Sequence, residues 1–388
     1  MDLLSFLDTS PTSFHAVKRL IEDSGALPFE GKIEAKTPYF VENEGALILF
    51  KTPKNPKRAT IAAAHTDSPS LKLKPNPVEV RDNLFTLSSD VYGTPLLRSW
   101  FNRDLSIAGK ILTKQGPKLI HLTDLALTIP ELAPHLGDNG DELNLQENLR
   151  AIVGFYDKNL EGKLLETLTQ ESEILAHDLF LVPCEKSSKL GLNKAFIASY
   201  RLDNLASCHA IAHAFKSSNP SELAMAVFWD HEEIGSETPY GALSPFFLDT
   251  LEQITLSLNM TREGFLNLKK ASRTYSIDLA HASHPNYPEK MEPNHAPLLG
   301  KGPALKWSAT RRYATDALSA APLPRLQRFV LRAGLKGGST IGPLHAAQTG
   351  IPTADLGIPE LSMHSIRELI AEKDHLEMIS LLKGIYDS

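Results

Sequence analysis

The stretch Thr60–Pro69 has the sequence T-I-A-A-A-H-T-D-S-P. Its first five residues are a short apolar run that Ser-Pro halts a few positions later, which is typical of a buried strand entering a loop. His65 and Asp67 follow the apolar part and stand two residues apart, so an extended backbone places both side chains on the same side. The stretch predicts a buried strand with a histidine and a carboxylate at its carboxyl end.

Three other apolar runs end in the same way, with polar side chains that could bind a metal ion just beyond them. The runs are Ala224–Trp229, Thr274–Ile277 and Ile351–Ile358. The polar residues that follow them include Glu232 and Glu233, then Asp278, then His364. Since ligands in layered α/β folds collect outside the carboxyl ends of the strands, we expect these side chains to share one site.

Between the strands lie stretches with helical apolar spacing. They are residues 10–21, with Pro11 suited to the first turn, Leu205–Phe215 and Ile366–Leu382. Strands that alternate with helices indicate an α/β fold with a central sheet flanked by helices.

Residues 75–189 differ in character from the rest of the chain. They contain short strand-like pieces such as Val78–Val80, Leu84–Leu87 and Ile107–Leu112. We interpret them as an inserted β-rich second domain, so that the first domain is discontinuous and consists of residues 1–74 and 190–388. The polar segment Gly137–Glu142 is expected to be an exposed loop of the insertion.

Composition limits the classes of function. With 388 residues, 42% of them hydrophobic, the chain can bury a substantial core. The net charge of −6 argues against a nucleic-acid partner, because neutralising phosphates requires clustered Lys and Arg. The two cysteines, Cys184 and Cys208, form no C-x-x-C motif, which favours a reducing compartment and argues against a thiolate metal site.

Targeting signals are also missing from the sequence pattern. Met1–Asp8 has neither a basic segment nor a long apolar one, and no run reaches about 18 apolar residues. We therefore expect a cytoplasmic protein that neither is secreted nor interacts with a membrane.

Two of the polar clusters suggest metal chemistry, although each has a simpler interpretation. In His65-Thr66-Asp67 one side chain can bind a metal while the other orients it, but the pattern H-x-D also arises often by chance. The adjacent Glu232 and Glu233 would repel each other unless a cation or a proton relieved them. One could then bind the metal while the other acts as general base, or both could be a solvated acidic pair at a helix start.

Asp203, in R-L-D-N before the Leu205 helix, has two interpretations as well. It could cap the helix, or its two carboxylate oxygens could bridge two metal ions. Asp278 and His364 complete a set of oxygen and nitrogen ligands around a shared aspartate. Such a set without thiolates suits zinc, with manganese or cobalt as alternatives.

Together these motifs resemble those of the aspartyl aminopeptidase family of two-metal exopeptidases, and the resemblance spans nearly the whole chain. The matching motifs, in order, are S-P-T-S-F-H-A-V at Ser10, H-T-D-S-P at His65, W-F-N-R-D-L-S-I-A-G at Trp100, R-L-D-N at Arg201, D-H-E-E-I-G-S at Asp230, D-L-A-H-A-S-H-P-N-Y at Asp278, G-S-T-I-G-P at Gly338 and S-M-H-S-I-R-E at Ser362.

The resemblance implies a central mixed β-sheet flanked by helices, as in di-zinc exopeptidases, and release of N-terminal amino acids from peptide substrates. It implies that His65, Asp203 and Asp278 hold one metal ion. It further implies that Asp203, Glu233 and His364 hold the other. Glu232 is then the general base, and Asp67 is the carboxylate behind His65.

Proteins similar to this one prefer an N-terminal aspartate or glutamate, and the resemblance implies Lys306 as the cation that reads the acidic side chain. The family's inserted domain mediates dimer contacts within a tetrahedral dodecamer. The resemblance also implies that His135 reaches the site of a neighbouring subunit.

The chain departs from the family at one place, and two other functions fit the same residues. Arg332-Ala333-Gly334 stands where the family has R-S-D, so a carboxylate is lost before the G-S-T-I-G-P motif, and the chain is shorter between Arg312 and Gln327. The ligand set alone also fits a related two-metal carboxypeptidase or deacylase. A scaffold without catalysis is the third alternative, although none of the expected metal ligands is missing.

Overall fold

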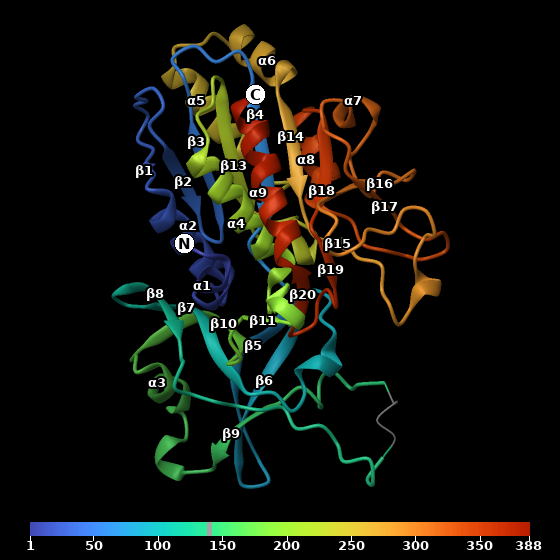
Figure 1. Ribbon diagram of the computed structural model, residues 1–388. Helices are drawn as coiled ribbons and strands as arrows, with labels where there is room; N and C mark the ends of the chain where they lie inside the picture. The colour runs from blue at the N-terminus through green and yellow to red at the C-terminus, as the bar shows by residue number, and fades with distance from the viewer. Residues whose placement is uncertain (138–141) are drawn as a thin grey trace.

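The computed structural model describes residues 1–137 and 142–388, and these residues form three β-sheets (Figure 1). The largest sheet has nine strands and mixes parallel with antiparallel pairs. In spatial order they are β1 (Leu27–Pro28), β2 (Tyr39–Asn43), β3 (Ala46–Lys51), β13 (Leu223–Trp229), β4 (Ala59–His65), β14 (Arg273–Ile277), β18 (Thr353–Gly357), β16 (Ala304–Trp307) and β17 (Gln327–Val330). All four runs that were predicted as strands lie in this sheet.

The central strands of this sheet are buried on both faces, which explains why their sequences are continuous apolar runs. Along β4, Ala62 and Ala64 belong to the apolar cluster on one face, while Ile61 and Ala63 belong to the cluster on the other. This alternation follows from the two-residue period of a strand.

Helices cover both faces of the nine-stranded sheet (Figure 1). On one face pack α1 (Leu3–Asp8), α2 (Ser13–Ser24), α4 (Leu202–Ser217) and α9 (Glu372–Asp387). On the other pack α5 (Phe246–Ser257), α6 (Arg262–Ala271) and α8 (Ile341–Thr349). The short helix α7 (Ala317–Ala320) lies beside β18. The predicted α/β fold, a mixed sheet flanked by helices, is confirmed.

The second sheet has six strands and forms the lower body in Figure 1, together with the short helix α3 (Leu164–Thr169). Its order is β8 (Gly116–His121), β7 (Leu105–Thr113), β10 (Ile174–Pro183), β5 (Ser70–Arg81), β6 (Leu84–Tyr92) and β9 (Ala151–Phe155). It has its own apolar cluster, built around side chains such as Trp100 and Leu105. In chain order its first strand is β5, which begins directly after the H-T-D-S-P motif.

The third sheet has five short strands, and it corrects one of the predicted helices. Its order is β11 (Ser188–Leu190), β12 (Phe196–Ser199), β20 (Glu368–Ala371), β19 (Pro359–Leu361) and β15 (Ala280–His281). The helix predicted over Ile366–Leu382 is wrong in its first part, because Glu368–Ala371 is a strand and α9 begins only at Glu372. The antiparallel pairing of β20 with both β12 and β19 outweighs the helical spacing of the segment.

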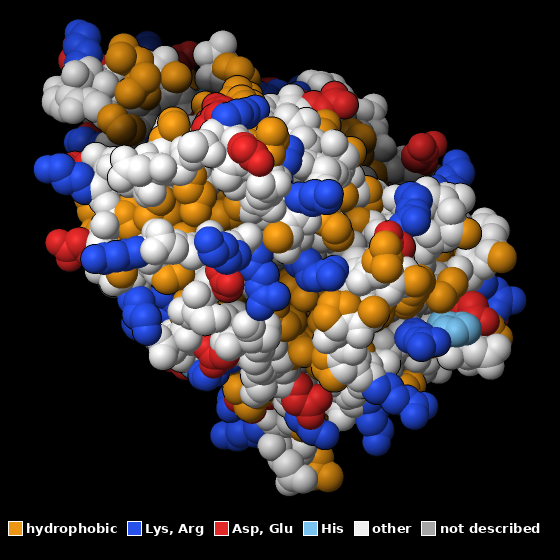
Figure 2. Space-filling model, turned by 90° about the horizontal axis from the view of Figure 1, so that it is seen from above, with side chains coloured by type: hydrophobic (Ala, Val, Ile, Leu, Met, Phe, Trp, Pro, Cys, Tyr) orange, Lys and Arg blue, Asp and Glu red, His pale blue; other side chains and the backbone are white. Residues whose placement is uncertain are grey.

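Smaller features also differ from the predictions. The first predicted helix starts at Ser13 after an extended Thr12, so Pro11 precedes the helix instead of opening it. Residues 138–141 of the expected loop Gly137–Glu142 lie outside the described residues. Within the described part of the chain, none of the helices combines the length and apolarity needed to cross a bilayer. On the face shown in Figure 2, Lys and Arg side chains are spread among acidic and apolar ones.

Candidate metal centre

Three neighbouring strands of the nine-stranded sheet end at one edge and bring their polar residues together. β4 pairs in parallel with β13 on one side and with β14 on the other, and Trp229 stands opposite His65. His65 is the last residue of β4, the acidic segment follows β13, and Asp278 follows β14. The rule that ligands gather at the carboxyl ends of parallel strands therefore holds here.

The two glutamates stand on a single 3-10 helical turn at Glu232–Ile234. His231 before the turn and Gly235 after it both adopt left-handed backbone conformations, with φ of 62° and 100°. The chain can therefore reverse direction directly after β13. Glu232 and Glu233 both line one cavity with His65 and Asp278, so they are not a solvated pair at the start of a longer helix.

The other two ligand candidates come from the five-stranded sheet. Asp203 follows β12 at the start of α4, but its φ and ψ of −82° and 104° are not helical and Arg201 occupies the N-cap position. Asp203 is therefore not the helix cap, and only 3% of its surface is exposed. His364 follows β19 with a left-handed φ of 66°.

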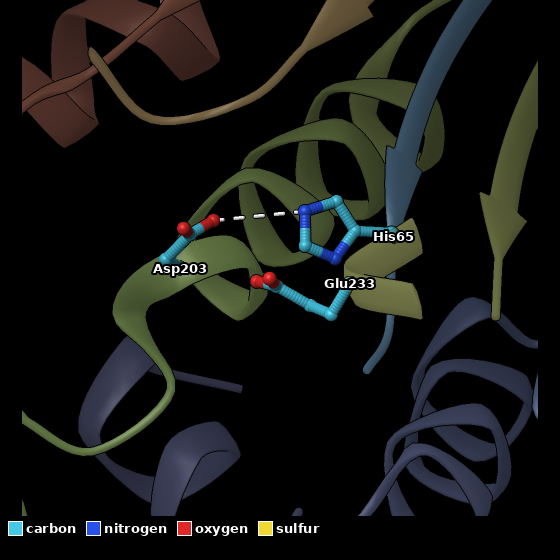
Figure 3. A group of neighbouring side chains, drawn as sticks. All are labelled: His65, Asp203 and Glu233. Carbon is cyan, nitrogen blue, oxygen red and sulfur yellow. Dashed lines mark ion pairs between the residues drawn. The ribbon is translucent and has the colours of Figure 1, made fainter. Parts of the chain in front are cut away.

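The side chains from the two sheets meet in a compact group. His65, Asp203 and Glu233 each offer a ligand atom within 4.8 Å of the others (Figure 3). His65 Nε2 lies 3.6 Å from Asp203 Oδ1 and 3.6 Å from Asp278 Oδ1. His364 Nε2 lies 3.4 Å from Asp203 Oδ2 and 3.4 Å from Glu233 Oε1. The structure thus brings together all five predicted ligands.

Asp67 supports the part of the group that comes from the nine-stranded sheet. The backbone N–H groups of Glu232 and Glu233 donate to its two carboxylate oxygens at 3.1 Å each, and the Tyr92 hydroxyl donates at 2.8 Å. His65 Nδ1 lies 3.1 Å from the Asp67 carbonyl oxygen and 3.4 Å from Oδ1 of its carboxylate. One buried carboxylate therefore orients the histidine and both glutamates, which is a common arrangement behind metal ligands.

The pKa shifts indicate that several acidic side chains lie close together in a buried site. Burial raises the pKa of Glu233 to about 7, although His364 acts against the shift. Burial, with a further contribution from Glu233 and Asp278, holds the pKa of Glu232 well above its usual value. Burial acts to lower the pKa of His65, but Asp278 and Asp67 outweigh it and raise that pKa. Without a cation, these groups can coexist only by sharing protons.

The orphaned oxygens of the group fit a metal ion. Within the described residues, Asp203 Oδ1 and Glu233 Oε1 are buried and accept no hydrogen bond. A buried carboxylate oxygen without a donor is costly, and a bound cation removes that cost. Carboxylate oxygens and imidazole nitrogens are the donors that zinc takes in sites without thiolates.

The candidate metal ligands line a cavity of about 520 Å³ that also contains Lys306 and Gly338–Thr340 of the G-S-T-I-G-P motif. Lys306 is 2% exposed, and its Nζ lies 3.5 Å from Asp278 Oδ2. Burial acts to lower the pKa of Lys306, but Asp278 outweighs it, so the side chain stays charged. Arg332–Gly334, where the chain departs from the family, is not among the residues that line the cavity. His135 is exposed and does not line it either.

Sequence reasoning missed three supporting groups. The first is Tyr92, at the end of β6, and no local pattern marks it. The second is Thr94, whose carbonyl oxygen and hydroxyl lie 2.9 and 3.0 Å from His364 Nδ1. The third is Glu368, which accepts from the backbone N–H groups of Asp203 and His364. Glu368 stands inside the quoted motif S-M-H-S-I-R-E, so its position four residues after His364 was the available signal.

Residues 6–386 match the model of the aminopeptidase I zinc metalloprotease family, M18. The chain belongs to the M18 family. A probable M18 family aminopeptidase 2 of Borreliella burgdorferi is 37% identical over 409 residues, with 99% of this chain and 96% of that protein covered. The Clostridium novyi protein of the same description is 36% identical, with 100% and 98% covered.

Solved structures agree with this assignment. A chain in a cryo-EM structure of the Ape4 and Nbr1 complex superposes with a TM-score of 0.91 at 32% identity, covering 99% of this chain and 84% of that one. The chain of the S. cerevisiae mApe1 dodecamer gives a TM-score of 0.84 at 25% identity, covering 99% and 95%. The fold predicted from the motifs is that of M18 aminopeptidases.

Family membership decides between the functions that the sequence left open. The chain is an M18 metallo-aminopeptidase, a hydrolase, and zinc is the metal of its family. The resemblance to aspartyl aminopeptidases is confirmed at the level of this family. The carboxypeptidase, deacylase and scaffold alternatives are set aside.

Proposed function

We propose that this M18 aminopeptidase holds two divalent metal ions and releases N-terminal residues from peptides, with a preference for aspartate and glutamate. The observation that carries the two-ion proposal is the position of Asp203. One of its oxygens faces His65, which also contacts Asp278, and the other faces His364, which also contacts Glu233. These contacts support two ligand sets that share one aspartate, which is the pattern of two-metal hydrolases.

One set consists of His65, Asp203 and Asp278, and the other of Asp203, Glu233 and His364. Zinc is our first choice for both ions, with manganese and cobalt as alternatives. When bound, the metal polarises the scissile carbonyl and increases the acidity of a water molecule.

In this proposal Glu232 is the general base. It takes a proton from the attacking water and returns it to the amine of the leaving peptide. Its Oε2 lies 3.9 Å from His65 Nε2, so it borders the ligand set, and it belongs to neither set of ligands. Asp67 fixes the backbone of Glu232 through the N–H group of that residue, which keeps the base in place.

Lys306 is our candidate for recognising the acidic side chain. It is a buried cation in the wall of the cavity, and discrimination for a carboxylate requires a positive partner. Its Nζ also lies 5.4 Å from the centre of the Tyr313 ring, so it is held from two sides.

Our proposal also covers the oligomeric assembly of the protein and its cellular compartment. We propose that residues 75–189 are a dimerisation domain within a dodecamer, and that His135 completes the site of a neighbouring subunit. The proposal is supported by the likeness to a dodecameric aminopeptidase and by the exposure of His135. Two free cysteines support a reducing, cytoplasmic compartment. Light scattering after gel filtration, with His135→Ala assayed at equal assembly state, tests this part.

The activity is tested by measuring release of the first amino acid from peptides that begin with Asp, Glu, Leu, Lys or Ala. Each is assayed with zinc, manganese or cobalt, and with a chelator. Chelator-sensitive release led by Asp and Glu supports the proposal, whereas release led by Leu or Ala would disprove the acidic preference.

The specificity pocket is tested by Lys306→Met, with the exposed Lys301→Met as its matched control. We expect Lys306→Met to lower kcat/KM for Asp peptides relative to Leu peptides, because it removes the positive partner. The control should keep the ratio. An unchanged ratio in Lys306→Met would assign the acidic preference to other residues.

A further inference from the structure

Two buried carboxyl groups lie on one face of the five-stranded sheet, behind the metal centre. Glu360 is on β19 and Glu368 on β20, and they are 1% and 2% exposed. The antiparallel register places Glu360 opposite Ile370, two residues along the strand from Glu368. Because side chains two residues apart share a face, the two carboxyl groups are diagonal neighbours. Neither takes part in the reaction described above.

Glu368 connects two ligand residues that are far apart in the chain. Its Oε2 accepts from the backbone N–H group of Asp203 at 3.0 Å. Its Oε1 accepts from the backbone N–H group of His364 at 2.8 Å. Each carboxylate oxygen of Glu368 therefore accepts a hydrogen bond from a different segment that carries a proposed ligand.

Both of these N–H groups need an acceptor that the local structure does not supply. Asp203 stands in the first turn of α4, where backbone N–H groups have no acceptor within the helix. His364 and Ser362 have left-handed φ values of 66° and 62°, an unfavourable conformation for residues other than glycine. Such conformations persist only where the surroundings fix them, and buried N–H groups require partners.

We propose that Glu368 is a positioning residue that ties the Asp203 and His364 segments together and so presets the metal centre. The proposal rests on the ligand set proposed above. Glu368 does not touch the reacting atoms in this account. It acts only through the two residues whose backbone it holds, as supporting groups behind metal ligands do.

Glu360 is a second buried carboxyl group on the same face as Glu368, and it offers a comparison with that residue. Within the described residues, no backbone N–H group of the Asp203 or His364 segment donates to its side-chain oxygens. A change at Glu360 therefore alters a buried acid beside Glu368 without removing the two contacts that hold the ligand segments.

Glutamine substitutions separate Glu368 from its neighbour Glu360. In Glu368→Gln one acceptor oxygen becomes an NH₂ group, which then faces an N–H group and cannot accept from it. Glu360→Gln makes the same exchange at a buried position that holds neither ligand segment. The half-exposed Glu372→Gln, at the start of α9, is the matched control, because that carboxylate pairs with Lys189 and not with a ligand segment in the part of the chain that the structure describes.

The experiment measures zinc affinity of the full-length protein by competition with a fluorescent chelator, together with the melting temperature of the metal-free form. We expect Glu368→Gln to weaken zinc binding by about 10- to 100-fold, the usual effect of losing a group behind the ligands. Glu360→Gln and Glu372→Gln should stay within about threefold of the wild type, and the melting temperature of the metal-free form shows whether Glu368→Gln is folded. If Glu368→Gln does not fold, Glu368→Asp replaces it, since the shorter side chain cannot reach both N–H groups.

Zinc affinity within about threefold of the wild type in Glu368→Gln or its replacement would overturn the proposal. An equal loss in Glu360→Gln would also overturn it, because the loss would then not depend on the two N–H contacts of Glu368. Asp203→Ala distinguishes this failure from failure of the ligand set. If Asp203→Ala loses zinc while Glu368→Gln keeps it, only the positioning role fails. If Asp203→Ala keeps zinc, the ligand set itself is wrong.

Discussion

The nine-stranded and five-stranded sheets each contribute part of the candidate metal centre, and they hold the proposed ligands in different ways. The nine-stranded sheet presents His65, the glutamates and Asp278 directly at the ends of three adjacent parallel strands. The five-stranded sheet presents Asp203 and His364 from irregular backbone after two short strands. Rigid strand ends need little extra support to bring side chains together, whereas irregular segments depend on specific hydrogen bonds.

Each part nevertheless has one buried carboxylate that accepts backbone N–H groups of functional residues. Asp67 accepts from Glu232 and Glu233, and Glu368 accepts from Asp203 and His364. The comparison suggests that the side chains set the chemistry of the centre, while these two carboxylates set its geometry. Substitutions can test whether Asp67 and Glu368 contribute equally to the geometry of the centre.

The largest effect is expected for Asp203→Ala, because Asp203 contacts the histidines of both parts. Zinc should be lost, and turnover should fall by more than the roughly 100-fold that changes behind the ligands cause. Elemental analysis after dialysis, together with peptide release, measures both. Asp178→Ala, which removes a surface ion pair with Lys72 in the six-stranded sheet, should keep zinc and turnover. Zinc retained in Asp203→Ala would contradict the proposal that two metal ions share Asp203 as a ligand.

A smaller effect is expected for Asp67→Asn. The amide replaces one acceptor of the carboxylate, so one N–H group of the glutamate turn loses its partner. Turnover or zinc affinity should fall by about 10- to 100-fold. Steady-state kinetics and chelator competition measure this. Since the glutamates follow a strand of the nine-stranded sheet, an effect larger than that of Glu368→Gln would reverse the comparison.

The smallest effect is expected for Tyr92→Phe, which removes a single hydrogen bond to Asp67. A hydrogen bond to a charged group contributes about 1.5–3 kcal/mol, and Asp67 keeps its other donors, so we expect turnover to fall by about tenfold or less. Tyr156→Phe is the matched control, since its hydroxyl donates to Glu161 away from the centre. A loss of zinc in Tyr92→Phe would show that Asp67 depends on this tyrosine alone.

The same contrast between the sheets explains how much could be predicted from sequence. His65, Glu232, Glu233 and Asp278 follow apolar strand runs, so a local pattern and the strand-end rule place them together. Asp67 was found because it stands two residues from His65. The family motifs supplied the assignment of the ligands to two ions.

The five-stranded sheet was harder to predict because its features depend on contacts between distant segments. Asp203 fitted a helix cap until its backbone conformation was known. Glu368 was placed at the start of a helix, and only the pairing of β20 with β12 and β19 makes it a strand residue. Glu360 and Glu368 are neighbours because of the register between β19 and β20. Spacing along the chain does not reveal that register.

We propose that both sheets together build a zinc centre. Glu232 lies beside that centre, is not one of its ligands and transfers protons. The most direct test is Glu232→Gln, with zinc content and peptide turnover measured on the same preparation. We predict that turnover falls by roughly 10²- to 10⁴-fold, the usual contribution of a general base, while zinc content equals that of the wild type. Turnover that persists near the wild-type rate, or zinc that is lost together with turnover, would contradict this account.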